Sequence, residues 1–454
     1  MADTDRKTVC AVLVITAVLR NFLRVSAQMQ GWTIAKNYAR PQNVSCNAMT
    51  KYITTYLITF FFLVSCQNQD DNKKTVPVMT NIQEEWLRYN FSSDIKTRTD
   101  SIKNEHSTTD AAVLYSNIGK YFSALQVFDQ AYEPTPNQSV FFDSTNYDIV
   151  PAIDYIIKEA AKNQIVIINE AHHVSYHRFF TMLLLNKLSE QGFNYFGAET
   201  LTLWDSSLVK NNYPTLNTGY YTVEPQYGNL IRQALKTGFK VFAYEPNEQG
   251  DGMQREIGQA KNIQKILKKD PKAKIVIHCG YAHLLEGEVQ GWGKAMAGRL
   301  MEYTGINPLT IDQVELTEHF EKKYENPYYD KFNYDKFVVP VNNGKMMGMS
   351  FRLQDGPSDI FVYHPRTHLK YNRPHWLFEY YSPKFINNDI TISFPVLVKA
   401  YISTENEKDA IPIDVIEINS KADTTALALI PKTSYKILVE NKQKQKQTLK
   451  FDVK

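Results

Sequence analysis

The sequence is short of cysteine, of net charge and of long apolar runs. Its 454 residues include 4 Cys, and 51 basic side chains oppose 48 acidic ones, which leaves a formal charge of only +3. This balance lacks the basic excess of nucleic-acid-binding proteins, so no nucleic-acid partner is expected. With so few cysteines no disulfide framework can hold the chain, and a hydrophobic core must do so. The apolar stretches near the N-terminus are short for a membrane-spanning helix.

The first 66 residues contain a targeting signal instead. Lys51 gives a positive start, residues 52–63 form a Phe-rich apolar core, and residues 63–66, Leu-Val-Ser-Cys, have the form of a bacterial lipobox. Cleavage before Cys66 would leave a lipidated cysteine that anchors the protein to a membrane through its acyl chains. Residues 1–48 would then be an upstream extension. The alternative is a membrane anchor or buried helix in which Cys66 is incidental.

The polar residues after this cysteine predict a tether and a location. Residues 67–71, Gln-Asn-Gln-Asp-Asp, resemble the acidic signal of surface-exposed lipoproteins in Bacteroidetes. We therefore expect a protein of the bacterial outer membrane or cell surface, tethered by residues 67–79. Cys279 is then the one unmodified cysteine, and a small buried apolar role is favoured for it over a nucleophilic one.

Residues 80–146 have a helical pattern. Within them, residues 105–138 resemble one tetratricopeptide repeat, with small and aromatic side chains at that repeat's spacings. A single repeat cannot bury its own hydrophobic face. A helical hairpin packed on the neighbouring domain is therefore favoured over a peptide-binding array.

Residues 147–370 alternate between helical and strand patterns. Helices between short apolar strands predict right-handed crossovers and an α/β domain, with a mainly parallel sheet covered by helices on both faces. Strands are expected at 165–168, 195–199, 240–244, 274–278 and 309–315, and helices at 150–162, 179–191, 227–237, 252–268 and 291–303.

The last segment, residues 385–454, has strands without helical periodicity. Short apolar runs separated by polar turns predict a small β-sandwich, and no catalytic pattern is visible in it. The expected strands are 390–396, 398–402, 411–418, 425–430, 435–440 and 447–453.

Residues 164–177 are the most informative stretch for function. Four consecutive β-branched residues, 165–168, predict a strand buried on both faces, and helical spacing follows from Phe179. The loop between them carries one carboxylate and three imidazoles. In an open parallel sheet ligands bind outside the carboxyl ends of the strands, so chemistry is expected at this loop. Its polar residues are Glu170, His172, His173 and His177.

Other predicted strands also end in chemically useful groups. Glu199 follows the second strand, Glu245 the third, and His278 and His283 surround the end of the fourth. A lone glutamate can cap the next helix, and a lone histidine is usually a satisfied interior or surface residue. Capping does not easily explain the convergence of four strand ends. A shared site is therefore predicted.

Several of these motifs together resemble the erythromycin esterase, ChaN and TraB/Tiki superfamily over residues 150–315. The resemblance implies an α/β fold with a Glu-x-x-His element after its first strand, matched by Glu170 and His173, and a late histidine, matched by His283. Members include macrolide esterases that activate water with Glu and His, haem-binding lipoproteins and membrane-tethered metallopeptidases. The motifs are Asn-Glu-Ala-His-His at 169–173, Gly-Ala-Glu-Thr at 197–200, Tyr-Glu-Pro at 244–246, Arg-Glu at 255–256 ahead of Gln-Ala-Lys-Asn at 259–262, and Gly-Tyr-Ala-His at 280–283.

The sequence departs from this pattern at two places. Asn169 stands where Gly is usual, and residues 278–283 replace the tighter His-Asn-x-His of the esterases. These departures put esterase activity on macrolides in doubt and leave the superfamily resemblance in place.

Two forms of hydrolysis are compatible with these residues. In a metal-free hydrolase of an ester or amide bond, Glu and His activate water and an arginine stabilises the oxyanion. In a metal-dependent one, a divalent cation lowers the pKa of its bound water. The metal-free form is slightly favoured, because Glu170-x-x-His173 lacks the paired histidine of the zinc-peptidase helix.

The candidate residues fall into three groups. The catalytic candidates are Glu170, His173, Glu199, Glu245, His283 and Arg255. The candidates for binding a small-molecule or peptide substrate are His177, Arg178 and Tyr281. The candidate metal ligands are His172, His173, His283 and Glu170.

Two other classes of function stay open. One is a haem-binding lipoprotein, in which His172, His173 or His283 is an axial ligand. The other is a non-enzymatic interaction lipoprotein that uses the helical hairpin and the β-domain. The hydrolase needs carboxylates beside imidazoles in one pocket, haem needs an open apolar slot, and the interaction protein needs neither.

Overall fold

The computed structural model describes residues 88–101, 105–134, 144–201, 207–246, 251–289, 291–342 and 358–453. Residues Glu85–Lys454 form one compact unit. The predicted signal peptide, Cys66 and the tether lie outside the described residues. None of the helices in these ranges has the length and apolarity to cross a membrane.

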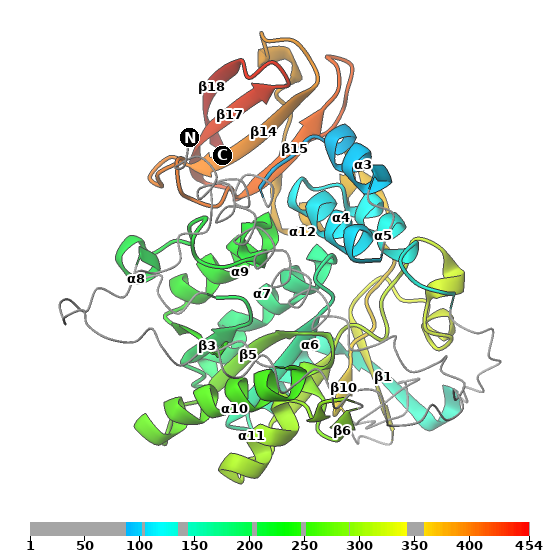
Figure 1. The fold of residues 1–454 in the computed structure, drawn as a ribbon, viewed down its shortest axis with the longest axis vertical. Coiled ribbons are helices and arrows are strands. Elements are labelled where there is room, and N and C mark those ends of the chain that lie inside the picture. Colours follow the sequence, from blue (N-terminus) through cyan, green and yellow to red (C-terminus); the bar gives the residue numbers. More distant parts are fainter. Residues whose placement is uncertain are drawn as a thin grey trace, which may run out of the picture. The chain divides into compact units, whose positions relative to one another are not determined.

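A six-stranded parallel sheet organises this unit (Figure 1). All of its neighbouring strands run parallel, so the mixed α/β fold expected from the alternating pattern is present. The strands in spatial order are β10 (Ile360–Phe361), β8 (Leu309–Asp312), β2 (Ile165–Glu170), β5 (Ile275–Gly280), β3 (Tyr195–Ala198) and β4 (Lys240–Ala243).

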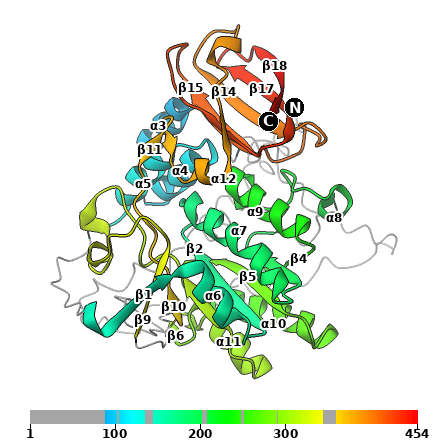
Figure 2. The ribbon, with the colours of Figure 1, turned by 180° about the vertical axis from the view of Figure 1, so that it is seen from behind.

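Alternate residues of β2 pack against different groups of helices. Val166 and Ile168 belong to one hydrophobic cluster, and Ile165 and Ile167 belong to another. Both faces of β2 are therefore buried, which explains its uninterrupted run of β-branched residues. The first cluster includes residues of α6 (Ala152–Ala160), α7 (Ser175–Glu190) and α9 (Pro225–Lys236), and the second includes residues of α10 (Gly252–Lys269) and α11 (Met296–Thr304). Figures 1 and 2 show these helices from opposite sides of the molecule.

The strand order reverses beside β2. The chain passes from β2 outward to β3 and β4, returns through β5 to a place between β2 and β3, and then continues to β8 on the other side of β2. Helices α7 and α9 precede the reversal, and α10 and α11 follow it. The carboxyl ends of β2, β5 and β3 therefore meet at a topological switch point, where ligands bind in such sheets.

The helices before the sheet pack against the strands at the C-terminal end. Ile95 and Leu114 share a cluster with Leu397 and Val415. The helical hairpin thus buries its apolar face on another part of the unit, while the tetratricopeptide resemblance stays a prediction because residues 135–138 lie outside the described ranges. These elements are α3 (Ser92–Ser101), α4 (Glu105–Asn117) and α5 (Tyr121–Asp129), with the antiparallel strands β14 (Val396–Ile402), β15 (Asp414–Ile418), β17 (Thr433–Asn441) and β18 (Lys446–Val453).

The positions predicted for a helix and a strand are wrong. Residues 147–151 form strand β1 (Tyr147–Pro151), antiparallel to β9 (Val338–Asn342), and the helix expected from residue 150 begins after Pro151. The strand expected at 390–396 is absent, and β14 begins only at Val396. Pro395 has no N–H to give to a ladder, and Ile390 instead packs into the core as irregular chain.

Some shorter elements were not expected at all. Before α11 there is a hairpin of two short strands, so that helix begins later than the pattern predicts. These elements are β6 (Glu288–Val289), β7 (Gly293–Lys294), α8 (Ser207–Asn211), α12 (Leu377–Tyr380) and β13 (Ser382–Lys384). Strand β13 pairs antiparallel with β16 (Leu427–Leu429), which lies within the strand expected at 425–430.

Candidate active site

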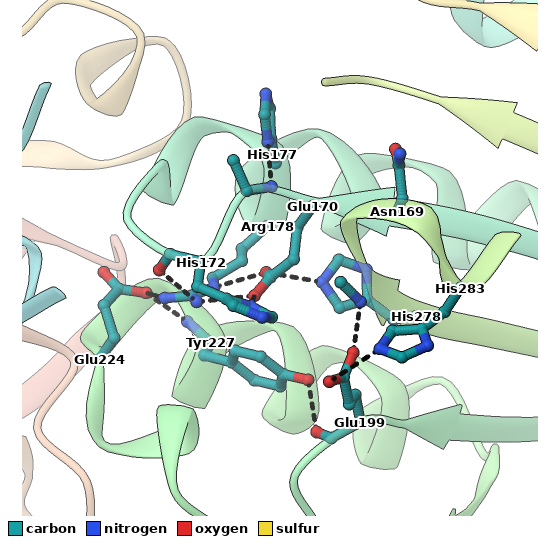
Figure 3. Close-up of polar contacts among 12 residues, drawn as sticks. Asn169, Glu170, His172, His177, Arg178, Glu199, Glu224, Tyr227, His278 and His283 are labelled. Carbon is teal, nitrogen blue, oxygen red and sulfur yellow. Dashed lines mark hydrogen bonds and ion pairs between the residues drawn. The ribbon is translucent and has the colours of Figure 1, made fainter. Parts of the chain in front are cut away.

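The carboxylate of Glu170 accepts hydrogen bonds from three side chains at the end of β2 (Figure 3). Arg178 donates from Nε at 2.7 Å and from Nη2 at 2.8 Å, while Nδ1 of His172 and Nε2 of His278 lie 3.0 and 2.8 Å from its oxygens. Burial raises the pKa of Glu170. The charge and hydrogen bonds of Arg178 have a larger and opposite effect, so the pKa lies well below its ordinary value. Glu170 is therefore an ionised carboxylate at a site where it is only 1% exposed.

Arg178 is held between two carboxylates. Its Nη1 donates to Glu224 at 3.0 Å, its Nη2 also donates to the carbonyl of His172 at 2.7 Å, and its guanidinium carbon lies 4.7 Å from the ring centroid of Tyr227. Glu224 caps α9 by accepting from the backbone N–H of Tyr227, and it also accepts from the hydroxyl of Ser175. The first turns of α7 and α9 are thereby fixed to the end of β2.

His172 presents one ring nitrogen away from Glu170. Because the carboxylate can only accept, Nδ1 carries the proton and Nε2 is left free to take one up. The ring stacks on Tyr221 at 4.1 Å between centroids and meets Tyr281 edge-on at 5.0 Å. A Cβ on Gly280 would stand 2.7 Å from Nε2. At 9% exposed, His172 is more accessible than the carboxylate that orients it.

A second carboxylate, Glu199, faces the same glycine from the residue after β3. One of its oxygens accepts from the backbone N–H of Gly280, and the other accepts from Nη2 of Arg255 at 2.6 Å and lies 3.6 Å from Nε2 of His283. Burial raises the pKa of Glu199, but His283 and Arg255 lower it to about 2. The two carboxylates therefore adjoin at Gly280, with His172 between them.

Arg255, in the first turn of α10, joins Glu199 to Glu245. Its Nε donates to Glu245 at 3.1 Å, and its Nη2 donates to the same carboxylate at 2.5 Å. Its Nη1 lies 2.8 Å from Nε2 of His283. One guanidinium thus draws together the ends of β3, β4 and β5.

His283 belongs to another carboxylate–imidazole pair. Its Nδ1 lies 2.9 Å from Glu256 on α10, and Glu256 also accepts from the backbone N–H of Met296 at the start of α11. The ring of Trp292 stacks beside it at 5.2 Å between centroids. Burial lowers the pKa of His283, but Glu256 and Glu199 raise it above its ordinary value. Arg255 can only donate, so Nε2 of His283 accepts from it, and Nδ1 of His283 donates to Glu256.

Two predicted residues, His173 and His177, have rings that contact other groups, and a third, Arg178, reaches Glu170 but has no exposed surface. The ring of His173 stacks on Phe128 of α5 at 3.6 Å between centroids, so His172, not His173, contacts Glu170. His177 lies in the first turn of α7 with no exposed surface, and its Nδ1 accepts from the backbone N–H of Ala171. Arg178 is fully buried as well. Both His177 and Arg178 have no exposed surface, and their contact with a substrate stays a prediction.

Sequence reasoning missed Glu224 and Glu256 as members of the site. Glu224 precedes Pro225 at a helix start, where a side-chain oxygen commonly caps and proline is favoured at the first helical position. Glu256 stands beside Arg255 and is buried on α10. A buried acid needs a charged or hydrogen-bonding partner. The position of Glu256 on the buried side of the helix was therefore the signal that could have placed it in the site.

The site does not fit a divalent cation. Glu170 is already paired with Arg178, and Glu199 and Glu245 are paired with Arg255. In the ranges that the structure describes, no group of three or more His, Cys, Asp or Glu side chains is placed to hold a metal ion.

The buried histidines around His177 predict an acid-sensitive fold. Its ring meets that of His364 edge-on at 4.8 Å between centroids. Burial and the neighbouring His364 lower the pKa of His177, and burial lowers that of His364 to about 3. Both pKa values are below the unfolded value of about 6.5, so unfolding takes up protons. This contribution to stability is complete above about pH 6.5 and is lost as the pH falls toward the folded values.

Urea unfolding at pH 7.5 and pH 5 measures this effect. The free energy of unfolding should fall between the two, and a His364→Gln variant should lose less on acidification than the wild type, because glutamine cannot take up a proton. An unchanged pH dependence in the variant would contradict this assignment.

Gly280 should tolerate no side chain. An alanine Cβ would lie 2.7 Å from Nε2 of His172, closer than real Cβ contacts allow, and 3.0 Å from Glu199, which is tighter than most such contacts. Since displacing a catalytic group by about 1 Å can cost ~100-fold in rate, we expect Gly280→Ala to lower turnover by about that factor. Steady-state kinetics with a melting curve on the same sample would check this, and a normal rate in the folded variant would show that the ring is not needed there.

No protein-family model matches the chain, and no curated protein matches it. Solved structures give weak likenesses. The type III effector HopBA1 is 12% identical with a TM-score of 0.31, over 49% of this chain and 99% of that one. RRSP, a MARTX toxin effector domain from Vibrio vulnificus, is 15% identical with a TM-score of 0.27, over 49% and 44%. ChaN of Campylobacter jejuni, described with cofacial heme binding, is 10% identical with a TM-score of 0.25, over 50% and 100%. TM-scores this low carry no argument about function.

Proposed function

We propose that this protein is a metal-free hydrolase of ester or amide bonds, in which Glu170 and His172 activate water. The observation that supports it is the hydrogen bond of 3.0 Å between Nδ1 of His172 and a buried, ionised Glu170. This bond fixes the tautomer in which Nε2 can accept a proton, as a carboxylate does for a histidine base in other hydrolases. Arg178 keeps Glu170 charged, and acts by positioning.

The second half of the site supplies positive charge opposite this base. Arg255 and His283 lie beside Glu199, within 2.8 Å of each other. In the proposed reaction Nε2 of His172 takes a proton from water, and the water oxygen attacks the carbonyl carbon. Arg255 stabilises the oxyanion that forms. Nε2 of His172 then gives this proton to the leaving group as the bond to it breaks.

The metal dependence of turnover tests this scheme. The substrates are a panel of nitrophenyl esters and nitroanilides. Addition of EDTA should leave the rate unchanged. Loss of activity with EDTA would indicate a metal enzyme, and absence of turnover together with a haem absorption band on titration would indicate a haem-binding protein instead.

We also propose that the protein works at the bacterial outer membrane or cell surface, anchored by a lipid on Cys66. The lipobox form of residues 63–66 and the polar residues after it support this location. Incorporation of labelled palmitate tests this proposal. The wild type should be labelled and Cys66→Ser should not, and equal labelling of the two would contradict lipidation at Cys66.

A further inference from the structure

Two partly buried carboxyl groups outside the site meet at one threonine hydroxyl. On β8, Oγ1 of Thr310 lies 2.7 Å from Oε1 of Glu286 and 3.5 Å from Oδ2 of Asp359. The backbone N–H of Asp359 donates to the same hydroxyl at 2.9 Å, and the backbone N–H of Thr310 donates to Oδ2 of Asp359 at 3.1 Å. We call Glu286, Thr310 and Asp359 the carboxyl latch.

The carboxyl latch joins two segments that are far apart in the sequence. One is residues 281–286, which we call the His283 segment. The backbone N–H of Gly298 on α11 donates to the carbonyl of Leu285 at 3.3 Å, and a Cβ on Gly298 would stand 2.5 Å from the carbonyl oxygen of Glu286. The other segment is β10, an edge strand of two residues that Asp359 directly precedes. The latch therefore holds the His283 segment to the edge of the sheet.

The hydroxyl of Thr310 cannot donate to both carboxyl groups. It has one proton, and its shorter distance is to Glu286. An ionised carboxylate can only accept hydrogen bonds, so two ionised carboxylates here leave one without a donor from this hydroxyl, and their charges repel. A proton on either carboxyl group supplies a second donor and removes the repulsion.

The surroundings of the latch favour this proton. Burial and the neighbouring Asp359 raise the pKa of Glu286 to about 7, and burial raises the pKa of Asp359. The other described residue that acts on both pKa values is Thr310, which has no charge. Burial, Glu159 and Asp359 raise the pKa of Tyr155 on α6 above its ordinary value, so Tyr155 stays neutral at physiological pH. None of these groups is a cation that could offset two negative charges.

The latch stabilises the fold most at low pH. The folded-state pKa of Glu286 lies above the unfolded value of about 4.3, so folding takes up a proton. This contribution to stability is complete below about pH 4.3 and is lost as the pH rises through about 7. Its direction is opposite to that of the buried histidines His177 and His364.

We propose that the carboxyl latch is a pH-sensitive switch that holds the His283 segment to β10 while one of its carboxyl groups is protonated. When both are ionised they repel each other, and the His283 segment loosens from the edge of the sheet. Because His283 lies three residues before Glu286 and contacts Arg255 at 2.8 Å, the switch acts on the arrangement of the site. It does not depend on the proposed hydrolysis, since the latch titrates whether or not the protein has that activity.

Glu286→Gln tests the latch in the full chain. Glutamine has the shape of a protonated glutamate and can both donate and accept at any pH. In urea unfolding, the stability of this variant relative to the wild type should be higher at pH 8.5 than at pH 5, by ~10-fold in the unfolding constant. The comparison between the two proteins cancels the titration of His177 and His364, which both contain.

A control and a second variant complete this measurement. Glu302→Gln removes an acid on α11 that pairs with Lys294, and it should gain no stability at either pH. Asp359→Asn removes the same repulsion from the other side of the latch and should show the same trend as Glu286→Gln. The test therefore stands if one of the two latch variants does not fold, which circular dichroism reports.

Hydrogen exchange shows whether the latch holds the two segments together. At pH 8.5, residues 280–285 and 358–361 should exchange faster in the wild type than in Glu286→Gln, and the difference should vanish at pH 5. These residues have the same sequence in both proteins, so their intrinsic rates match. If the stability difference between the proteins is the same at both pH values, the latch does not titrate, and the proposal is wrong. Equal exchange of these residues at pH 8.5 would equally overturn it, because the carboxyl groups would then not control the His283 segment.

Discussion

His172→Gln should lose most hydrolytic turnover, whereas His173→Gln should keep most of it. General bases contribute ~100- to 10,000-fold to rate, and of these two histidines only His172 has a ring that contacts Glu170. The ring of His173 lies against Phe128 instead. The two histidines are adjacent in sequence and both are buried, so the second variant is a matched control for the first.

The measurement compares turnover of the nitrophenyl ester panel and the melting temperature between the two variants. His173→Gln should affect stability more than rate, because it changes the packing between β2 and α5. If His173→Gln abolished turnover and His172→Gln did not, the Glu-x-x-His element of the resembled superfamily would be the working pair, and the proposed base would be wrong.

The sheet could be predicted because its signals are local. Four consecutive β-branched residues are enough to indicate the buried strand β2, and helical spacing after Phe179 is enough to indicate α7. The polar residues after successive strands fall at one edge whenever the strands are parallel, so Glu199, Glu245 and His283 could be placed near Glu170 from their order alone. In the structure, Arg255 contacts Glu199, Glu245 and His283.

The pairing of imidazoles with carboxylates could not be predicted in this way. His172 and His173 are equally close to Glu170 in sequence, and the choice is made by distant groups. Arg178 donates to the carbonyl of His172 and fixes the backbone there. Phe128, on a helix before the sheet, takes the ring of His173. The hydrophobic periodicity of the sequence predicts neither contact.

The prediction of a strand at 390–396 was wrong for a related reason. The alternating apolar and polar residues at 390–394 have the pattern of a strand, yet Ile390 packs into the core without ladder pairing. Composition reports that a side chain will be buried. It does not report whether the backbone will find a partner strand, since that depends on residues such as Ser382 and Leu429, which pair with each other.

Arg178→Met should destabilise the fold strongly. Arg178 is fully buried and lies between Glu170 and Glu224, whose carboxylates are buried as well. Removing one partner from a buried ionic group leaves uncompensated charge and costs about 3–5 kcal/mol. Lys96→Met is the control, because Lys96 and Asp100 form an exposed pair on α3 and exposed pairs contribute little. Urea unfolding of both variants at pH 7.5 measures the difference.

A second measurement separates charge from lost packing over Tyr227. Without Arg178, burial should raise the folded-state pKa of Glu170 above its unfolded value, so the folded variant binds protons more readily than the unfolded one. Its stability should then rise, relative to wild type, as the pH falls through that raised pKa. Adding Glu170→Gln and Glu224→Gln to Arg178→Met should recover part of the loss at pH 7.5, because no buried charge is left unpaired. If the triple variant is as unstable as Arg178→Met and neither responds to acid, the loss comes from packing, and Arg178 is not what keeps Glu170 charged beside His172.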